Sequence, residues 1–245
     1  MSKLTSFRLL SFDVYGTLID WETGFITALH PILTRNNKSD ISRQTILSTC
    51  VELESAQQKK TPDMLYSDLL TTIHPELCLR LGCATPTSEE SAAFGKSIKN
   101  WPAFPDTLGA LYKLRKYFKL VVLSNVDNES FQSSLKGPLK DFPFDAVITA
   151  QDIGSYKPDL RNFEYMLRIV GSTFGVSKEE VLQTAQSQYH DHKPCRSLGI
   201  KGAWIDREGA VCGNVGVGEE VWDWRFGTLG EMAGEVEREA GEKEG

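Results

Sequence analysis

Short apolar runs alternate with helical patterns along much of the chain. Residues 7–12 form a mostly apolar run that ends at a charged residue, Asp13, and a Gly-Thr turn signal, as is typical of a buried strand in a parallel sheet. Further strands are predicted at 120–125, 145–150, 181–187 and 201–207. Helical patterns precede or separate them at 105–117, 128–136, 160–170 and 192–198. This alternation predicts βαβ units, and hence an α/β fold with a parallel sheet.

The pattern differs between residues 20 and 98. Apolar residues recur there at helical spacing, and four helices are predicted, the last two starting at Pro62 and Ser88. Because one strand precedes this block and the others follow it, we expect a helical cap inserted into the core. The charged stretch 234–245 is expected to end a surface helix. The predicted domains are an α/β core at 1–19 and 99–240, a helical cap at 20–98, and a disordered tail at 241–245.

Composition narrows the class of protein. The 245 residues include 33 acidic and 27 basic ones, for a formal net charge of −6; this balance argues against general nucleic-acid binding, although a local basic patch can still hold a small anion. No apolar run approaches the roughly 18 residues of a membrane span, and the start MSKLTSFRLL lacks the apolar core of a signal peptide. The five cysteines lack metal-site spacing and are expected to be reduced. We therefore expect a soluble, cytoplasmic protein that binds neither nucleic acid nor membrane.

Hydrogen-bonding or charged residues follow four of the predicted strands. In chain order they are Asp13, Tyr15 and Thr17, then Ser124 and Asn125, then Lys157, then Asp191. Taken singly, each has an ordinary explanation as a helix cap, a turn residue or a solvated surface lysine. The carboxyl ends of parallel strands meet at one edge of a sheet, so the whole set is expected to converge on one crevice. The backbone amides of Gly16 and Thr17 are candidates to face an anion there.

Four segments carry a family resemblance. FDVYGTLID, LSN, YKPD and QSQYHD resemble, in this order, the four motifs of the haloacid dehalogenase (HAD) superfamily. DVYGTLID in particular is similar to the L-2-haloacid dehalogenase branch, and the whole resemblance runs from about residue 8 to residue 207. It implies a Rossmann-like core with a helical cap inserted after the first motif, in agreement with the change of pattern near residue 20.

The resemblance implies a hydrolase with Asp13 as its nucleophile. A carboxylate held in a dry crevice beside an ammonium group can attack an electrophilic carbon or phosphorus, and water then hydrolyses the resulting ester. Thr17 and Ser124 are expected to orient the nucleophile or the substrate. Lys157 is expected to hold the charge of the nucleophile and to bind an anionic substrate, while Asp191 anchors Lys157 or helps to activate water.

Tyr15 favours carbon over phosphorus as the reacting centre. HAD phosphatases resemble the pattern Asp-x-Asp-Gly-Thr, in which the second aspartate protonates a departing alkoxide. This chain has Tyr15 at that position; a phenol is a weak acid, whereas a departing halide needs no proton. We therefore expect a 2-haloacid dehalogenase that needs no cofactor. The alternatives are a phosphatase of small phosphoesters, with Mg²⁺ held by Asp13, the Tyr15 carbonyl and Asp191, and a HAD-fold protein without enzymatic activity.

Several positions depart from the haloacid dehalogenase pattern. The candidates for the family's halide-binding arginine are Arg43 and, as a second choice, Arg35. The family's Ser-x-Asn pair becomes Gln186 and Gln188, and His190 stands where that branch has a tryptophan. Each departure concerns the substrate pocket, so the hydrolytic residues are retained while the substrate changes. The residues predicted to bind the substrate are Tyr15, Arg43, Asn125, Gln188 and His190.

The same resemblance bears on partners and motion. We expect a small anionic substrate, enclosed when the cap closes about the two segments that join it to the core, 18–22 and 96–102. Two-fold dimers through the cap are common in this branch, so the resemblance allows a homodimer. The stretch 213–220 resembles a phosphate-binding loop only in its glycine count and is predicted to be a mobile turn.

Overall fold

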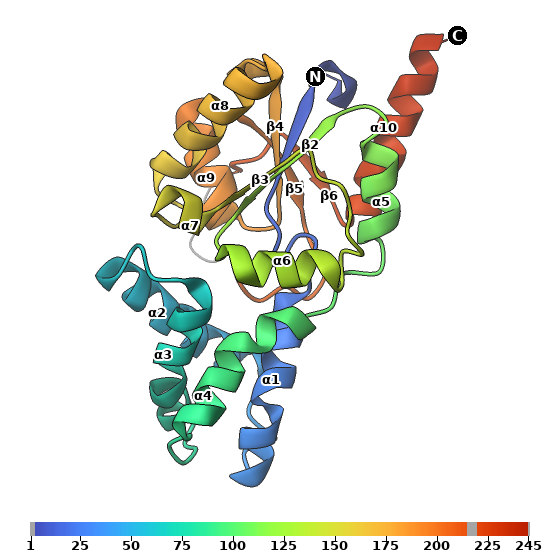
Figure 1. Cartoon of the computed structure of the whole chain (residues 1–245). Helices are drawn as coiled ribbons and strands as arrows, with labels where there is room; N and C mark the ends of the chain where they lie inside the picture. Colours follow the sequence, from blue (N-terminus) through green and yellow to red (C-terminus); the bar gives the residue numbers. More distant parts are fainter. Residues whose placement is uncertain (1–2, 215–219, 245) are drawn as a thin grey trace.

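The structure, a computed structural model, describes residues 3–214 and 220–244; most of the predicted turn at 213–220 lies outside the described residues. In the described part of the chain, six parallel strands form one sheet in the order β3-β2-β1-β4-β5-β6 (Figure 1). The strands are β1 (Leu9–Phe12), β2 (Lys119–Ser124), β3 (Ala146–Thr149), β4 (Val181–Ala185), β5 (Lys201–Ile205) and β6 (Trp224–Phe226). The predicted α/β fold with a Rossmann-like parallel sheet is therefore confirmed.

Helices connect and flank these strands. Their starts follow local sequence signals: the Asp127 side chain accepts a hydrogen bond from the Ser130 amide at the start of α6, and Asp159 caps α8 in the same way. The helices that flank the sheet are α5 (Thr107–Leu114), α6 (Asn128–Lys136), α7 (Ala150–Ile153), α8 (Leu160–Phe174), α9 (Lys193–Leu198) and α10 (Leu229–Glu244).

Both faces of the sheet are buried. Successive side chains of a strand point to opposite sides, so Leu9 of β1 packs in an apolar cluster with residues of α8 and α9, whereas Leu10 and Phe12 pack in a second cluster with residues of α5 and α10. Figure 1 shows these two pairs of helices on opposite sides of the sheet. Burial on both faces explains why the strands appear in the sequence as nearly continuous apolar runs.

Four helices between β1 and β2 stand apart from the sheet, beyond the carboxyl end of β1 (Figure 1). They are α1 (Trp21–Arg35), α2 (Arg43–Lys60), α3 (Tyr66–Arg80) and α4 (Ser88–Gly95). The two segments that join them to the core run side by side: the Asp20 amide donates to the Pro102 carbonyl at 2.8 Å, and the Phe104 amide donates to the Leu18 carbonyl at 3.1 Å. These helices occupy the block that the sequence assigned to a cap.

The start of α3 corrects the sequence prediction. The helix begins at Tyr66, whereas Pro62 lies in the preceding turn. The Met64 amide closes this turn on the Thr61 carbonyl at 3.2 Å, and the Met64 carbonyl accepts a hydrogen bond from the Tyr156 hydroxyl at 2.6 Å. This contact with the core holds the chain out of helical geometry until Tyr66.

Helix α10 corrects the predicted disordered tail at 241–245. The helix continues through residue 244, and residue 245 lies outside the described residues. Arg238 pairs with Glu235 one turn before it and with Glu242 one turn after it, and Lys3 pairs with Glu242 at 3.0 Å. Opposite charges at this spacing stabilise the last turns of a helix that the glycine-rich sequence alone would weaken.

Two predictions from composition concern membrane-spanning segments and the state of the cysteines. Among residues 3–214 and 220–244, no helix is long and apolar enough to cross a membrane. The five cysteines are free thiols, and Cys212 is the only one of them that is not buried.

Candidate active site

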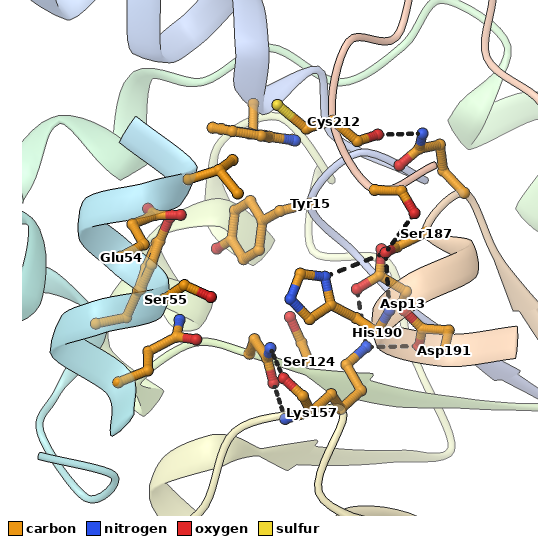
Figure 2. A pocket seen from close by; sticks show the side chains of 17 residues that line it. Asp13, Tyr15, Glu54, Ser55, Ser124, Lys157, Ser187, His190, Asp191 and Cys212 are labelled. Atoms are coloured by element: carbon orange, nitrogen blue, oxygen red, sulfur yellow. Dashed lines mark hydrogen bonds and ion pairs between the residues drawn. The ribbon is translucent and has the colours of Figure 1, made fainter. Parts of the chain in front are cut away.

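A small cavity of about 110 Å³ lies between the carboxyl edge of the sheet and helix α2 (Figure 2). Its core side is formed by residues that follow different strands, because neighbouring parallel strands deliver their loops to the same edge. These residues include Asp13 after β1, Ser124 and Asn125 at the end of β2, Lys157 after α7, and His190 and Asp191 after β4. The structure thus brings together residues that are up to 178 positions apart in the sequence.

Lys157 links the two buried carboxylates of this cavity. Its ammonium nitrogen lies 2.9 Å from Asp13 Oδ1 and 2.8 Å from Asp191 Oδ1, and it also donates to the Leu123 carbonyl at 2.8 Å. The three donors of the ammonium group are therefore all engaged. The Asp191 Oδ1 atom accepts a further hydrogen bond, at 2.8 Å, from Gln183 Nε2 of β4. These contacts fix the position of Lys157 and, through it, of Asp13.

Burial controls the charges of this cluster. Burial alone would lower the pKa of Lys157, but the Asp13 and Asp191 carboxylates outweigh it and hold this pKa above its usual value. The pKa of Asp191 is raised, first by burial and then by the charge of Asp13, while Lys157 and Gln183 act against the rise. One ammonium group thus faces two carboxylates, and burial makes the ionised form of Asp191 less favourable than that of an exposed aspartate.

Thr17 holds the second oxygen of Asp13. Its hydroxyl donates to Asp13 Oδ2 at 2.7 Å and accepts a hydrogen bond from the Gln186 amide at 2.9 Å. The backbone amides of Gly16 and Thr17, predicted to face a bound anion, do not do so. The Gly16 amide donates to the Ile19 carbonyl and the Thr17 amide to the Val14 carbonyl. The tight turn itself needs these two bonds, and a positive φ of 101° at Gly16 makes it possible.

Ser124 and Asn125 have different roles in this geometry. The Asn125 side chain accepts from the Lys157 amide at 2.7 Å and donates to the Lys157 carbonyl at 3.0 Å, so it fixes the loop that carries the lysine. The Ser124 hydroxyl is buried beside the cavity and has no hydrogen-bond partner among the described residues. It is therefore a free donor for a bound molecule.

Tyr15 and His190 both line the cavity, as predicted for substrate-binding residues. The Tyr15 hydroxyl pairs with Ser134 Oγ at 2.8 Å, and burial raises the pKa of this phenol well above its usual value. The His190 ring pairs with Ser187 Oγ at 3.1 Å; burial and then the charge of Lys157 lower the pKa of His190 to about 4. At neutral pH the imidazole is uncharged and the phenol keeps its proton.

Two other predicted substrate-binding residues lie elsewhere. Arg43 does not line this cavity: its guanidinium pairs at 2.8 Å with Glu22, a buried carboxylate that requires a cation. Arg35, the second candidate, pairs with Glu90. Gln188, two residues before His190, is buried but is not among the cavity residues. No arginine therefore lines the cavity within the described residues.

The cap side of the cavity contains residues that the sequence did not indicate. Figure 2 shows Glu54 and Ser55 of α2 across the cavity from Asp13, Lys157 and Asp191. The other residues of this side are Trp21, Val51, Gln58 and Tyr66. The spacing of residues 51, 54, 55 and 58 places them on one face of α2. A helix face that packs in the core has the same spacing, so the sequence could not show that this face lines a cavity; only the packing of α2 over the sheet shows it.

The residues that the phosphatase alternative assigns to Mg²⁺ do not fit a metal ion well. Lys157 already donates to one oxygen of Asp13 and to one of Asp191, so a cation lies between these carboxylates. Among residues 3–214 and 220–244, no group of three or more His, Cys, Asp or Glu side chains is arranged to hold a metal ion. The donor set suits an ammonium group better than a divalent cation.

Comparison with known proteins agrees with this geometry. A family model described as "Haloacid dehalogenase-like hydrolase" matches residues 10–205. The (S)-2-haloacid dehalogenase 4A of Burkholderia cepacia is 26% identical over 209 residues, which cover 83% of this chain and 85% of that protein. The (S)-2-haloacid dehalogenase of Pseudomonas sp. (strain YL) is 24% identical over 243 residues, which cover 96% of this chain and 97% of that protein.

A solved structure extends the similarity to the fold. The L-2-haloacid dehalogenase of Xanthobacter autotrophicus, solved with chloropropionic acid covalently bound, superposes with a TM-score of 0.76 at 18% identity. The match covers 94% of this chain and 98% of that structure. The two proteins thus share their fold over nearly their whole lengths.

Proposed function

Because this chain belongs to the haloacid dehalogenase-like hydrolases, we propose that it is a 2-haloacid dehalogenase that displaces halide through an ester formed on Asp13. The observation that carries this proposal is the setting of Asp13, a buried carboxylate that lines the cavity and is held by Thr17 and Lys157. The relatives that are 24% and 26% identical, both (S)-2-haloacid dehalogenases, support the choice of substrate class.

In the first step an oxygen of the Asp13 carboxylate attacks C2 of the 2-haloacid. A carbon–oxygen bond forms as the carbon–halogen bond breaks, and the halide leaves with the bonding electron pair. The hydrogen bonds from Thr17 and Lys157 hold the carboxylate in one orientation, which lowers the entropic cost of reaching the reactive geometry. No proton is needed, because a halide is stable as an anion.

In the second step water attacks the carbonyl carbon of the Asp13 ester. The bond between this carbonyl carbon and the substrate oxygen breaks, and the departing oxygen takes up one proton of the attacking water, so that a 2-hydroxy acid leaves. The other proton is released to solvent, and the Asp13 carboxylate is restored. Asp191 Oδ2 is buried without a hydrogen-bond partner among the described residues, so it is the oxygen that we assign to the water proton. The raised pKa of Asp191 suits a base that works near neutral pH. Lys157 stabilises the negative charge on the ester oxygen.

Ser124 supplies a contact for the substrate carboxylate. Its hydroxyl is buried beside the cavity and has no hydrogen-bond partner among residues 3–214 and 220–244, so it can donate to an incoming anion. The Tyr15 hydroxyl is engaged by Ser134 and has a raised pKa, so it is a poor proton donor for a departing alkoxide. Because a departing halide needs no proton, the weak acidity of Tyr15 favours halide chemistry over phosphoester chemistry.

Halide release tests the proposal directly. The (S) enantiomers of 2-chloropropionate and 2-bromopropionate are incubated with the protein, beside an aryl phosphate, each with Mg²⁺ and with EDTA. We expect halide release that EDTA does not change, and for Asp13→Asn a loss of kcat of about a thousandfold or more, since the nucleophile is removed. Asp13→Asn should stay folded, because an amide oxygen can still accept from Thr17.

Two results would contradict the proposed dehalogenase. Phosphate release that requires Mg²⁺, without halide release, means that the carboxylates of this cavity bind a metal. Halide release that Asp13→Asn leaves intact means that another residue is the nucleophile.

A further inference from the structure

Glu54 is a carboxylate on the cap side of the cavity. It lies on α2, opposite Asp13 and Lys157 (Figure 2), and lines the same cavity of about 110 Å³. Its Oε1 atom accepts a hydrogen bond from the Tyr66 hydroxyl of α3 at 2.7 Å. Tyr66 is buried and lines the cavity as well. The pair is therefore a fixed polar group on a side of the cavity that also carries Trp21, Val51, Ser55 and Gln58.

Glu54 has no cationic partner within the described residues. Lys157 is the only positively charged side chain among the residues that line the cavity, and its three donors go to Asp13, Asp191 and Leu123. Arg43, which the sequence indicates as the first candidate for an anion-binding arginine, pairs with Glu22 instead. The cap side of the cavity thus presents a hydrogen-bond acceptor and no charge that would attract an anion.

We propose that Glu54 and Tyr66 form a second binding subsite, which accepts a hydrogen-bond donor such as an amide or hydroxyl at the end of the substrate remote from the reacting carbon and disfavours a second carboxylate there. The inference deepens the proposed function, on which it rests for the reacting end of the substrate. A donor group would add a hydrogen bond to the Glu54 carboxylate beside those from Tyr66 and Cys50, whereas a carboxylate would be buried against a like charge.

The surroundings of Glu54 agree with this subsite. Burial raises its pKa to about 7, while the hydrogen bonds from Tyr66 and Cys50 act against the rise. The other titratable groups that face it are Cys212 and Tyr156, both of which are neutral at this pH because burial raises the pKa of each. At pH 8 the carboxylate form of Glu54 prevails, so the discrimination against a second anion should be greatest there.

Two substrates of the same shape test the subsite. They are (S)-2-chlorosuccinate and its 4-amide, which differ only in whether the end remote from the chlorine carries a carboxylate or a neutral amide. At pH 8 we expect the wild-type kcat/KM to be about tenfold to a hundredfold higher for the amide, because the second carboxylate of chlorosuccinate would be buried against the charge of Glu54. Glu54→Gln, which keeps size and the Tyr66 contact, should reduce this ratio to less than about threefold.

Glu52→Gln is the matched control. It removes the same charge from the same helix, but Glu52 is 71% exposed and pairs with Arg80 on the surface. This variant should keep the wild-type ratio, and thermal unfolding should show that both variants are folded. Equal kcat/KM values for the two substrates in the wild type, or a ratio that Glu54→Gln leaves unchanged, would overturn the subsite while leaving dehalogenation intact.

Binding separates the subsite from the reaction. If neither these substrates nor (S)-2-chloropropionate releases halide, the proposed function fails, and the subsite is then tested with (S)-malate and its 4-amide by calorimetry at pH 8. Tighter binding of the amide by about tenfold in the wild type, lost in Glu54→Gln, supports the subsite. Equal affinity for the two ligands, or no binding of either, overturns it.

Discussion

At the scale of single residues, the site depends on one lysine between two acids. Removing two carboxylates and an ammonium group from water is costly, and only close pairing with full hydrogen bonding offsets that cost. Lys157 meets this condition with three contacts between 2.8 and 2.9 Å, while Asp191 keeps one oxygen unpartnered among the described residues. Lys157 therefore fixes the positions of the two carboxylates, and Asp191 Oδ2 is the oxygen that remains available to accept a proton.

Glu54 makes the stability of the protein depend on pH. Burial raises its pKa in the folded state from 4.5 to about 7, so the folded protein favours the protonated form. Its contribution is favourable below about pH 4.5 and is lost as the pH rises to about 7. We expect Glu54→Gln to increase the free energy of unfolding by about 1–2 kcal/mol more at pH 8 than at pH 4.5.

Urea denaturation of the wild type, Glu54→Gln and Glu52→Gln at the two pH values measures this difference. Glu52→Gln removes an exposed charge and should show almost no pH-dependent difference from the wild type. A pH dependence that is identical in the wild type and Glu54→Gln would mean that Glu54 is ionised in the folded protein with an ordinary pKa.

At the scale of elements, two segments after β4 and β5 complete the cavity. The π-helical turn Gln188–His192 directs His190 into the cavity and Asp191 onto Lys157, although the two residues are adjacent. The loop after β5 is held by Glu22 of α1, whose carboxylate accepts from the Val211 amide at 3.0 Å and from the Cys212 amide at 2.9 Å. A cap residue thus holds a core loop against the cavity.

Cys212 reports on this loop. It is the only one of the five cysteines that is partly exposed, and its partial burial, followed by the charge of Glu22, raises the pKa of its thiol. Glu22→Gln removes that charge and weakens the contacts to the loop. We therefore expect a thiol reagent to modify Cys212 about tenfold faster in this variant, because both access and thiolate fraction increase. Mass spectrometry of the modified peptide measures the rate.

Glu239→Gln is the control for the loop experiment. Glu239 is also a buried carboxylate that accepts from two backbone amides, those of Leu4 and Thr5, but it lies on α10. This variant should leave the rate at Cys212 unchanged. An equal acceleration in both variants would indicate general destabilisation instead of a local contact.

At the scale of the whole molecule, the cap and the core share one apolar cluster. The cluster runs from Leu10 and Phe12 of β1 to Phe25 of α1 and Leu69 of α3. Trp101, 1% exposed, lies at the junction, and its ring packs on that of Tyr15 in a T-shaped arrangement with the ring centroids 5.6 Å apart. The two connecting segments pair through Ile19 and Ala103. Any closing of the cap must therefore turn about this paired junction.

Ligand binding should change hydrogen exchange at that junction. In Asp13→Asn protein with (S)-2-chloropropionate, we expect amide exchange in peptides covering 18–22 and 96–104 to slow by about threefold or more, because closure protects the amides of Asp20 and Phe104. Peptides from α10 should not change. Equal exchange with and without ligand at both segments would show that the cap does not close about this junction.

Much of the core could be predicted because each strand is buried on both faces. A run such as LVVLS needs no partner to be recognised, and β2 begins and ends within one residue of the predicted range. Shorter elements could not be predicted in this way. β6 has three residues, of which none is fully buried, and its pairing with β5 depends on long-range contacts.

The sequence by itself determined the order of the first five strands and the core side of the site, because parallel strands bring the residues after Phe12, Leu123 and Ala185 to one edge whatever the details of packing. Only the tertiary structure decided what faces Asp13 across the cavity. Arg43 is paired with buried Glu22, while Glu54 and Tyr66 take the cap side. The physical reason is that helix α2 offers several polar residues, and its packing over the sheet selects which of them meet the substrate.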